Sequence, residues 1–239
     1  MWSVCKKELR QFFSSLTGYI AIAVFLLVNG LVLFVFKANI LENGYATLDD
    51  FFRLAPWVLI FLIPAITMRA LADEYRGGTF EVLRTRPLSS WQIVSGKFWG
   101  SFLVAFIALL PTLIYYVTIN QLAATTGIDA GAAAGAYLGL LALTAVFTSI
   151  GIFISSSTAN AVVAFIISAL ALALLYYGFT AISQLAIGNS ADYFIDLIGI
   201  ESHYRSISRG VIDTRDVVYF GSLSLFFLFL TQQTISKRA

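Results

Sequence analysis

The chain is organised around residues 71–97, LADEYRGGTFEVLRTRPLSSWQIVSGK. This is the densest charged segment in a very apolar sequence, and it also carries several signals for the ends of helices. Gly77-Gly78 ends any helix that enters the stretch, since paired glycines favour a loop over a helix. Thr79 can cap a short new helix over residues 79–85. Pro87 closes that helix, because the residue before a proline is displaced from the helical region.

The short helix between these signals has two unlike sides. Phe80 and Leu83 fall on one side, and Glu81 lies beside them. A two-turn amphipathic helix between two long apolar segments indicates that something docks on it, and the alternative is a solvated loop between helices. Ser89 and Gln92 have capping-box spacing, which predicts that the next helix begins there.

The composition is typical of a membrane protein. Of the 239 residues, 59% are hydrophobic and only 12% are charged, which is about half the charged fraction of a soluble domain. The surplus of apolar residues is therefore expected to face lipid. Six runs are long enough to cross roughly 30 Å of hydrocarbon, namely Gly18–Phe36, Leu54–Leu71, Phe98–Asn120, Ala133–Ser155, Asn160–Ala186 and Val217–Ile235.

These runs predict an all-α integral membrane protein with six transmembrane helices in a single domain, residues 1–239. The positive-inside rule places both termini in the cytoplasm, because ten Lys and Arg residues fall on the side of the N-terminus and five on the other. Residues 72–97 are then a cytosolic loop, and residues 187–216 are the longest outer loop. Within that outer loop, residues 193–198 are expected to dip back toward the bilayer, and Asp213 to cap the last span.

Residues 1–17 have the pattern of an amphipathic helix. Hydrophobic residues recur at three- and four-residue steps with basic residues between them, which favours a helix lying flat at the membrane surface. Packing on a soluble partner is the alternative. The residues assigned to this interfacial helix are Trp2, Lys6, Lys7, Arg10, Phe12 and Phe13.

Small and polar residues mark expected helix contacts. Gly131, Gly135 and Gly139 are four residues apart, as are Gly96 and Gly100, and such spacing lets two backbones approach in lipid. Packing within the chain and dimerisation both account for it. Hydrogen bonding between helices is the expected role for most of the uncharged polar residues in the runs, which are Asn29, Thr67, Thr112, Tyr115, Tyr116, Thr144, Thr148, Ser149, Ser168, Tyr176, Tyr177 and Gln184.

Several kinds of chemistry are missing from the sequence. It contains no Gly-x-x-x-x-Gly-Lys-[Ser/Thr] phosphate loop, so the chain is not expected to hydrolyse ATP by itself. Cys5 is the only cysteine and His203 the only histidine, which excludes a cysteine-rich or histidine-rich metal centre; His203 is expected to be an ordinary surface residue. No acidic or basic residue lies in the middle of a run, unlike in most ion-coupled transporters. Energy is therefore expected to arrive from outside, through residues 72–97.

Three parts of the chain share a pattern with one family. They are KKELRQFFSS at residues 6–15, MRALADE followed by GTFEVL and PLS within residues 68–89, and HY, RGVID and DVVYF within residues 203–220. Through them the chain resembles the membrane subunits of ABC-2 type transporters, most closely the gliding-motility-associated and nitrous-oxide-reductase-maturation kinds. Two departures are Asp73, where a glutamate is usual, and the lack of the family's frequent proline near Leu16.

The resemblance implies a permease subunit of an ATP-driven exporter in the inner membrane of a prokaryote, paired with a second permease and two cytosolic ATPase subunits. ATP and magnesium would bind to the ATPase, and no catalytic, cofactor or metal residue is implied for this chain. In that family the short cytosolic helix, called the coupling helix, docks into a cleft of the ATPase. Carried over to this chain, Phe80 and Leu83 are the apolar anchor. The full set of docking candidates is Glu74, Thr79, Phe80, Glu81 and Leu83.

Two other classes of function compete with this interpretation. One is a membrane scaffold or anchoring subunit of an envelope assembly that transports nothing. The other, an intramembrane enzyme, lacks a constellation of residues to support it. Sugars, lipids, peptides, copper-related cargo and mechanical work on an envelope partner are all compatible with the sequence, and the second permease can be the same chain or a different one.

Overall fold

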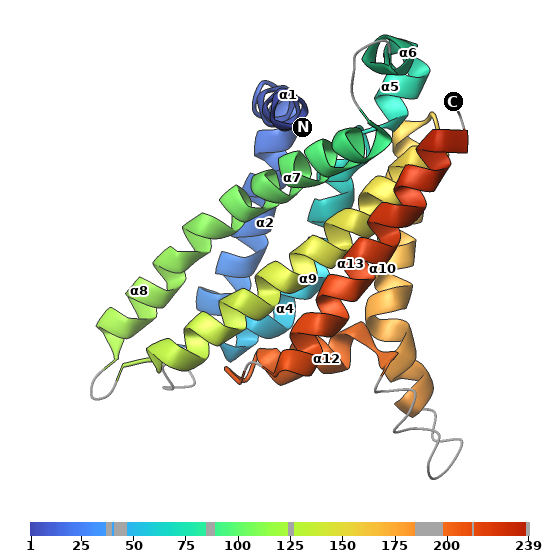
Figure 1. Cartoon of the computed structure of the whole chain (residues 1–239). Coiled ribbons are helices and arrows are strands. Elements are labelled where there is room, and N and C mark those ends of the chain that lie inside the picture. The colour runs from blue at the N-terminus through green and yellow to red at the C-terminus, as the bar shows by residue number, and fades with distance from the viewer. Residues whose placement is uncertain are drawn as a thin grey trace.

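The computed structural model of the chain is a bundle of helices (Figure 1). It describes residues 1–36, 40, 47–84, 89–123, 127–184, 198–211 and 213–237, apart from the side chains of residues 82–84 and 184, and no strand occurs among these residues. The elements are α1 Trp2–Phe13, α2 Leu16–Phe34, α4 Asp49–Thr67, α5 Ala72–Arg76, α6 Thr79–Arg84, α7 Ser90–Leu109, the 3-10 turn η1 Leu110–Thr112, α8 Leu113–Leu122, α9 Ala130–Ser157, α10 Ala161–Gln184, α12 Ile200–Ile207 and α13 Thr214–Lys237.

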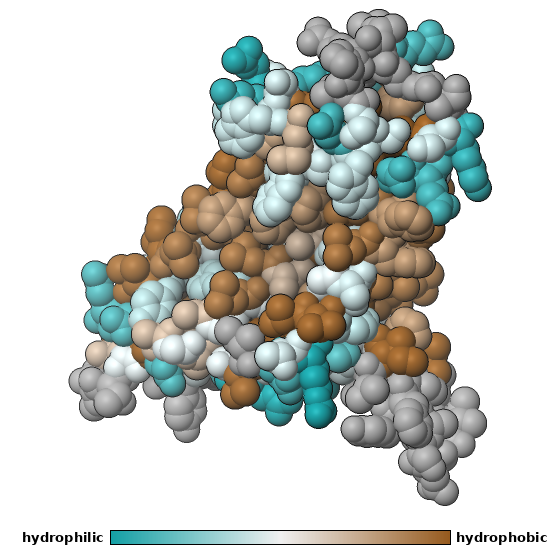
Figure 2. Space-filling model, in the orientation of Figure 1, coloured by the Kyte–Doolittle hydropathy of each residue, from teal (hydrophilic) through white to brown (hydrophobic). Residues whose placement is uncertain are grey.

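Within the part of the chain that the structure describes, six helical stretches are long and apolar enough to cross a membrane. Figure 2 shows apolar side chains across the middle of the visible face and hydrophilic ones toward both ends, which is the pattern that a bilayer imposes. The chain is therefore an all-α integral membrane protein with several crossings. The six stretches are Leu16–Phe34, Asp49–Arg76, Ser90–Leu122, Ala130–Ser157, Ala161–Ser183 and Thr214–Lys237.

The two ends of the bundle carry different short elements. Figure 1 places α1, α5, α6 and both chain termini at one end and α12 at the other. Both termini on one side agree with an even number of crossings. Of the segment expected to dip back toward the bilayer, residues 193–197 lie outside the described residues.

Helix α9 is the centre of the bundle, because 72% of its most apolar 18-residue stretch is buried inside the protein. It packs against α4, α7, α10 and α13. Its glycine repeat lets α12 approach closely, because a Cβ atom at Gly139 would lie 2.7 Å from the side chain of Ile207, and one at Gly135 would lie 2.9 Å from the backbone of Gly210. Packing within the chain therefore accounts for these two glycines of the repeat.

Proline affects two crossings differently. Helix α4 continues through Pro56 and Pro64, whereas at Pro111 the third crossing changes from α-helix to the 3-10 turn η1. Proline lacks an N–H group and disturbs the preceding turn. The Tyr137 hydroxyl donates a hydrogen bond to the carbonyl of Thr112 (3.0 Å), so a neighbouring helix supplies a partner at the interruption.

Most polar side chains within the crossings bond to their own helix. The hydroxyls of Thr67, Thr144 and Thr148 each donate to the carbonyl four residues earlier, at 2.7 to 2.9 Å. The expectation of bonds between helices is wrong for these residues, because the nearest carbonyl of the same helix satisfies a short hydroxyl side chain. Tyr115 does bridge two helices, since its hydroxyl donates to the carbonyl of Leu26 at 2.8 Å.

The single histidine is not an ordinary surface residue. His203 Nδ1 lies 2.6 Å from Oδ1 of the buried Asp216, and its ring stacks on Tyr219 with centroids 3.9 Å apart. The expected cap of the last helix is confirmed, because Asp213 Oδ1 accepts a hydrogen bond from the N–H of Arg215 (2.9 Å). These contacts hold the first turns of α13 against α12.

Candidate functional site

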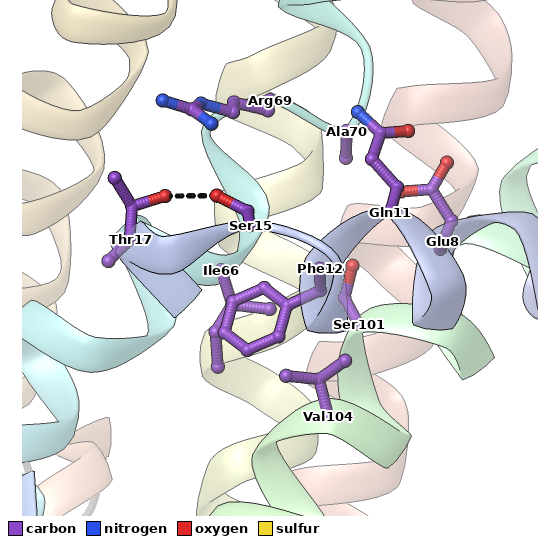
Figure 3. Close-up of a pocket in the computed structure, with 11 residues that line it drawn as sticks. Glu8, Gln11, Phe12, Ser15, Thr17, Ile66, Arg69, Ala70, Ser101 and Val104 are labelled. Atoms are coloured by element: carbon purple, nitrogen blue, oxygen red, sulfur yellow. Dashed lines mark hydrogen bonds between the residues drawn. The ribbon is translucent and has the colours of Figure 1, made fainter. Parts of the chain in front are cut away.

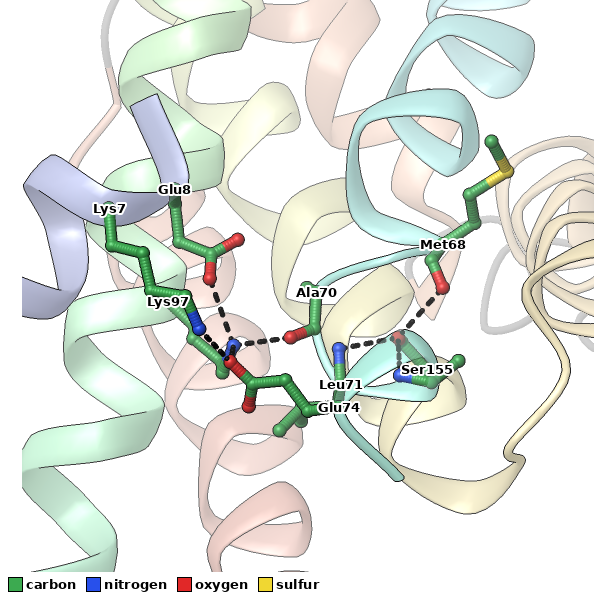
Figure 4. Close-up of polar contacts among 9 residues, drawn as sticks. Lys7, Glu8, Met68, Ala70, Leu71, Glu74, Lys97 and Ser155 are labelled. Atoms are coloured by element: carbon green, nitrogen blue, oxygen red, sulfur yellow. Dashed lines mark hydrogen bonds and ion pairs between the residues drawn. The ribbon is translucent and has the colours of Figure 1, made fainter. Parts of the chain in front are cut away.

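The second crossing is broken near its end. Helix α4 ends at Thr67, and α5 begins only at Ala72. The hydroxyl of Ser155, on α9, donates to the carbonyl of Met68 (3.1 Å) and accepts from the N–H groups of Leu71 (3.1 Å) and Ala72 (3.2 Å), as Figure 4 shows. Backbone groups at a buried helix end need such partners. The neighbouring helix α9 therefore determines the shape of this break, residues 68–71.

A buried ion cluster lies beside the break. The side chain of Lys97, on α7, is 0% exposed, and its Nζ atom lies 2.9 Å from Glu8 Oε1 and 2.9 Å from Glu74 Oε1. The same ammonium donates to the carbonyl of Ala70. Lys7 Nζ lies 2.6 Å from Glu74 Oε1 (Figure 4). These four side chains and the Ala70 carbonyl are called the Lys97 cluster below.

The Lys97 cluster is internally compensated. Two ammonium groups face two carboxylates, and the three hydrogens of the Lys97 ammonium have three acceptors. Burying an unpaired charge is expensive, so loss of one partner from such a pair costs about 3–5 kcal/mol. The cluster therefore holds together three regions that are distant in sequence, namely α1, the break with the adjoining α5, and α7.

Helix α1 packs on α7 at two glycines. A Cβ atom at Gly96 would lie 2.8 Å from the Cβ of Val4, and one at Gly100 would lie 2.6 Å from the Cβ of Glu8. The two glycines therefore serve packing within this chain. Cys5 is buried, and burial raises the pKa of its thiol, with the negative charge of Glu8 adding to the effect.

The other residues assigned to the interfacial helix line its outer side or its C-terminal end. Trp2 is 60% exposed, and the ammonium of Lys6 lies 5.6 Å from the centroid of its ring. Arg10 is exposed, whereas Phe12 and Phe13 are partly buried with ring centroids 5.6 Å apart. The helix thus presents aromatic and basic groups outward while Val4, Cys5 and Glu8 face α7.

A small pocket lies under the end of α1. Figure 3 shows it between Phe12 of α1, Ile66 of α4 and Ser101 of α7, with Arg69 at its edge. Its volume is about 40 Å³, room for about three water molecules. It is too small to hold a transported solute.

The short helix α6 begins after Gly78, whose φ of +66° places it in the left-handed region that favours glycine. Phe80 is 5% exposed, and its ring centroid lies 4.8 Å from that of Tyr75. Thr79 and Glu81 are exposed. The apolar cluster that includes Phe80 also contains Leu71, Val94, Phe98, Ile152, Leu228 and Ile235.

These positions change the roles expected for two docking candidates. Phe80 is buried within this chain, beside Tyr75 of α5 and in one apolar cluster with residues of α7, α9 and α13, so its side chain is not exposed to a partner. Glu74 is 7% exposed and bonded within the Lys97 cluster, so it is not free to meet a partner's basic residue. Thr79 and Glu81 share the exposed surface of α6, and the side chain of Leu83 lies outside the described residues.

The sequence interpretation missed Glu8 and Lys97 as functional residues, although a signal for Lys97 was present. The capping box is confirmed: Ser89 Oγ accepts from the Gln92 N–H (3.2 Å), and Gln92 Oε1 accepts from the Ser89 N–H (3.1 Å). The third crossing helix therefore begins at Ser90, well before the apolar run. Lys97 lies four residues after the buried Ile93, on a face that enters the protein.

Comparison with known proteins identifies a family. The model of the family described as "ABC-2 family transporter protein" matches residues 2–234, and so nearly the whole chain. No curated protein matches the sequence.

Proposed function

Since the chain belongs to the ABC-2 transporter family, we propose that this permease subunit receives its energy from a separate cytosolic ATPase that docks on α6. Membrane subunits of this family work with cytosolic ABC ATPases in general, and they are generally not enzymes themselves. The observation that carries the proposal is the orientation of α6, whose apolar residue Phe80 is buried in this chain while Thr79 and Glu81 are exposed.

The proposed contact is polar on the side of this chain. Glu81 is the carboxylate of α6 that a basic residue of the ATPase would meet, and Thr79 is an exposed hydroxyl two residues earlier, at the start of α6. Leu83 remains a candidate from the family resemblance. Glu74 is assigned a different role, because it holds α5 to α1 and α7 through Lys7 and Lys97.

Motion of α6 would reach the crossings through two rigid connections. The first is the apolar cluster that Phe80 shares with residues of α7, α9 and α13. The second is the Lys97 cluster, which joins α5 to α1 and α7. Because closely packed interiors transmit displacement, a shift of the docked helix would move several crossings together.

The finer parts of the assignment rest on the family resemblance and on charge distribution. We place the protein in the inner membrane of a prokaryote with both termini in the cytoplasm, since the end that carries α1 and α6 also carries most of the Lys and Arg residues. We propose export as the direction, a second permease copy or chain as partner, and kinship with the gliding-motility and nitrous-oxide-reductase-maturation permeases.

Charge reversal at Glu81 tests the docking proposal. Glu81→Lys is expected to insert in the membrane normally and to lose at least about tenfold in recovery of a co-expressed ATPase during affinity purification, because a favourable ion pair becomes a repulsion. Asp50→Lys makes the same charge change in the first turn of α4, at the opposite end of the bundle, and is expected to retain the ATPase.

Two outcomes would contradict the proposal. One is equal recovery of the ATPase with Glu81→Lys and with the native chain. The other is a labelling experiment in intact cells that finds position 81 on the outer side. ATP hydrolysis by the reconstituted complex that responds to a transported solute would separate a transporter from a non-transporting scaffold.

A further inference from the structure

A second, larger pocket lies at the end of the bundle opposite to the Lys97 cluster. Its volume is about 420 Å³, within the range of pockets that hold small molecules. It lies between the first turns of α4, the last turns of α10, and α12 with the turn that follows it. The lining residues are Asp49, Phe52, Arg53, Trp57, Tyr176, Glu201, Tyr204, Arg205, Ser208 and Arg209.

The floor of this outer pocket is rigid and aromatic. The Tyr204 hydroxyl donates to the carbonyl of Phe52 (2.7 Å), which fastens α12 to α4. Tyr176 packs edge-on against Trp57, with centroids 5.8 Å apart, and lies 6.5 Å from Tyr204. Such a floor is preorganised, so a ligand would not need to order it on binding.

The rim of the pocket carries excess positive charge. Among the five charged residues, Glu201 and Arg205 form an ion pair at 2.6 Å. The other three charged residues are one acid, Asp49, and two bases, Arg53 and Arg209, so one positive charge is in excess. The Arg209 Nε–H donates to a backbone carbonyl at 3.3 Å, and neither Arg53 nor Arg209 meets a carboxylate within ion-pair distance among the described residues. Two guanidinium groups, each able to bind an anion in a bidentate way, therefore remain at one rim.

An apolar track leads from the pocket toward the middle of the membrane. The rings of Trp57 on α4 and Tyr177 on α10 are 5.3 Å apart. One turn closer to the middle of the membrane on each helix, Phe61 of α4 is 61% exposed and Leu174 of α10 is 69% exposed. Residues three or four apart lie on the same face of a helix, so the exposed apolar side chains continue inward from the charged rim.

We propose that this outer pocket binds a membrane lipid with an anionic headgroup. The headgroup phosphate lies between the guanidinium groups of Arg53 and Arg209, and an acyl chain lies along Trp57, Phe61 and Leu174. Charge complementarity and the adjoining track favour a lipid over a soluble anion, because a free phosphate would leave the track uncovered. The proposal goes beyond the proposed function, since binding requires this chain alone and no ATPase.

Titration of the purified full-length protein in a neutral detergent tests this inference. The probes are short-chain phosphatidylglycerol, phosphatidylcholine with the same chains, and inorganic phosphate, with bound ligand counted by native mass spectrometry. The variants are Arg53→Gln, Arg209→Gln and their combination. Arg215→Gln is the matched control, because Arg215 is exposed at the same end of the bundle but does not line the pocket.

Saturable binding of phosphatidylglycerol is expected, at least about tenfold tighter than binding of phosphatidylcholine. The combined variant should weaken it at least about tenfold, since each charge-assisted hydrogen bond contributes strongly, whereas Arg215→Gln should change it less than about twofold. Both arginines are exposed, so these variants are expected to fold. Undiminished binding by the combined variant would overturn the proposal. So would displacement of the lipid by inorganic phosphate at equal concentration, which would identify the ligand as a soluble anion.

Discussion

Replacing Lys97 by methionine removes the central charge of the Lys97 cluster and retains a long apolar side chain. In the native protein this ammonium contacts Glu8, Glu74 and the carbonyl of Ala70. After the substitution Glu74 still has Lys7 at 2.6 Å. Glu8 loses the ion pair that Lys97 provides, and the Ala70 carbonyl loses a donor.

The size of the effect follows from burial. Breaking a buried pair by removing one partner costs about 3–5 kcal/mol. The Glu8 side chain is 11% exposed, and the access of some water favours the lower end, about 3 kcal/mol. For a chain of this length that corresponds to a fall in Tm of about 6 to 12 °C.

The assay is thermal unfolding of the purified protein in detergent, followed by the fraction that elutes as a single folded species. Lys6→Met is the matched control, because Lys6 is an exposed lysine on α1, the helix that carries Glu8, and it contacts only the Trp2 ring among the interactions identified. It should change stability by less than about 0.5 kcal/mol. Adding Glu8→Gln to Lys97→Met removes the uncompensated charge and should recover more than about half of the loss.

Two results would refute this reasoning. One is unfolding of Lys97→Met at the same temperature as Lys6→Met, which would mean that the ammonium is not paired in a buried site. The other is a further loss of stability when Glu8→Gln is added to Lys97→Met, which would mean that Glu8 is held by groups other than Lys97.

Two other predictions concern α1 and α12. Gly100→Leu should separate α1 from α7, because a Cβ at this position would lie 2.6 Å from Glu8. Cys5, the only cysteine, is buried at this contact and has a raised thiol pKa, so its labelling by maleimide at neutral pH should become at least about tenfold faster in Gly100→Leu. Gly178→Leu is the control, because nothing lies within 4 Å of the added Cβ, and it should leave Cys5 protected. Unchanged labelling in Gly100→Leu would contradict the packing. Tyr204→Phe should cost about 1–2 kcal/mol at neutral pH, because the Phe52 carbonyl loses its donor. Burial raises the pKa of Tyr204 well above its ordinary value. The stability that this phenol contributes is therefore complete below about pH 10 and is lost as the pH rises further. A difference in unfolding free energy between native and Tyr204→Phe protein that stays constant from about pH 8 to about pH 11 would contradict this.

The parts of the fold that depend on local pattern could be predicted from the sequence. Lipid exposure requires long apolar helices, so hydropathy alone indicates six crossings. The capping box at Ser89 and the cap at Asp213 are local hydrogen-bonding patterns, and both are present in the structure. The end of α5 at Gly77-Gly78 likewise follows from backbone preference.

The parts that depend on tertiary contact could not be predicted. Lys97 and Glu8 are 89 residues apart, and a lysine just before an apolar run resembles a loop residue until the helix start at Ser90 is given weight. Phe80 illustrates a second limit of pattern. The spacing of its neighbours predicts that α6 has an apolar side, but it does not specify whether this side faces the chain itself or a partner.

The break in the second crossing has a consequence for how related chains diverge. Its backbone depends on Ser155 of α9 and Lys97 of α7 as well as on residues 68–71. A substitution of Ser155 or Lys97 would leave these buried backbone groups of the break without partners, whereas a side-chain change within residues 68–71 keeps the backbone groups in place. Positions 97 and 155 are therefore expected to change little among related chains, whereas lipid-facing positions such as Leu27 and Leu170 are free to exchange one apolar residue for another.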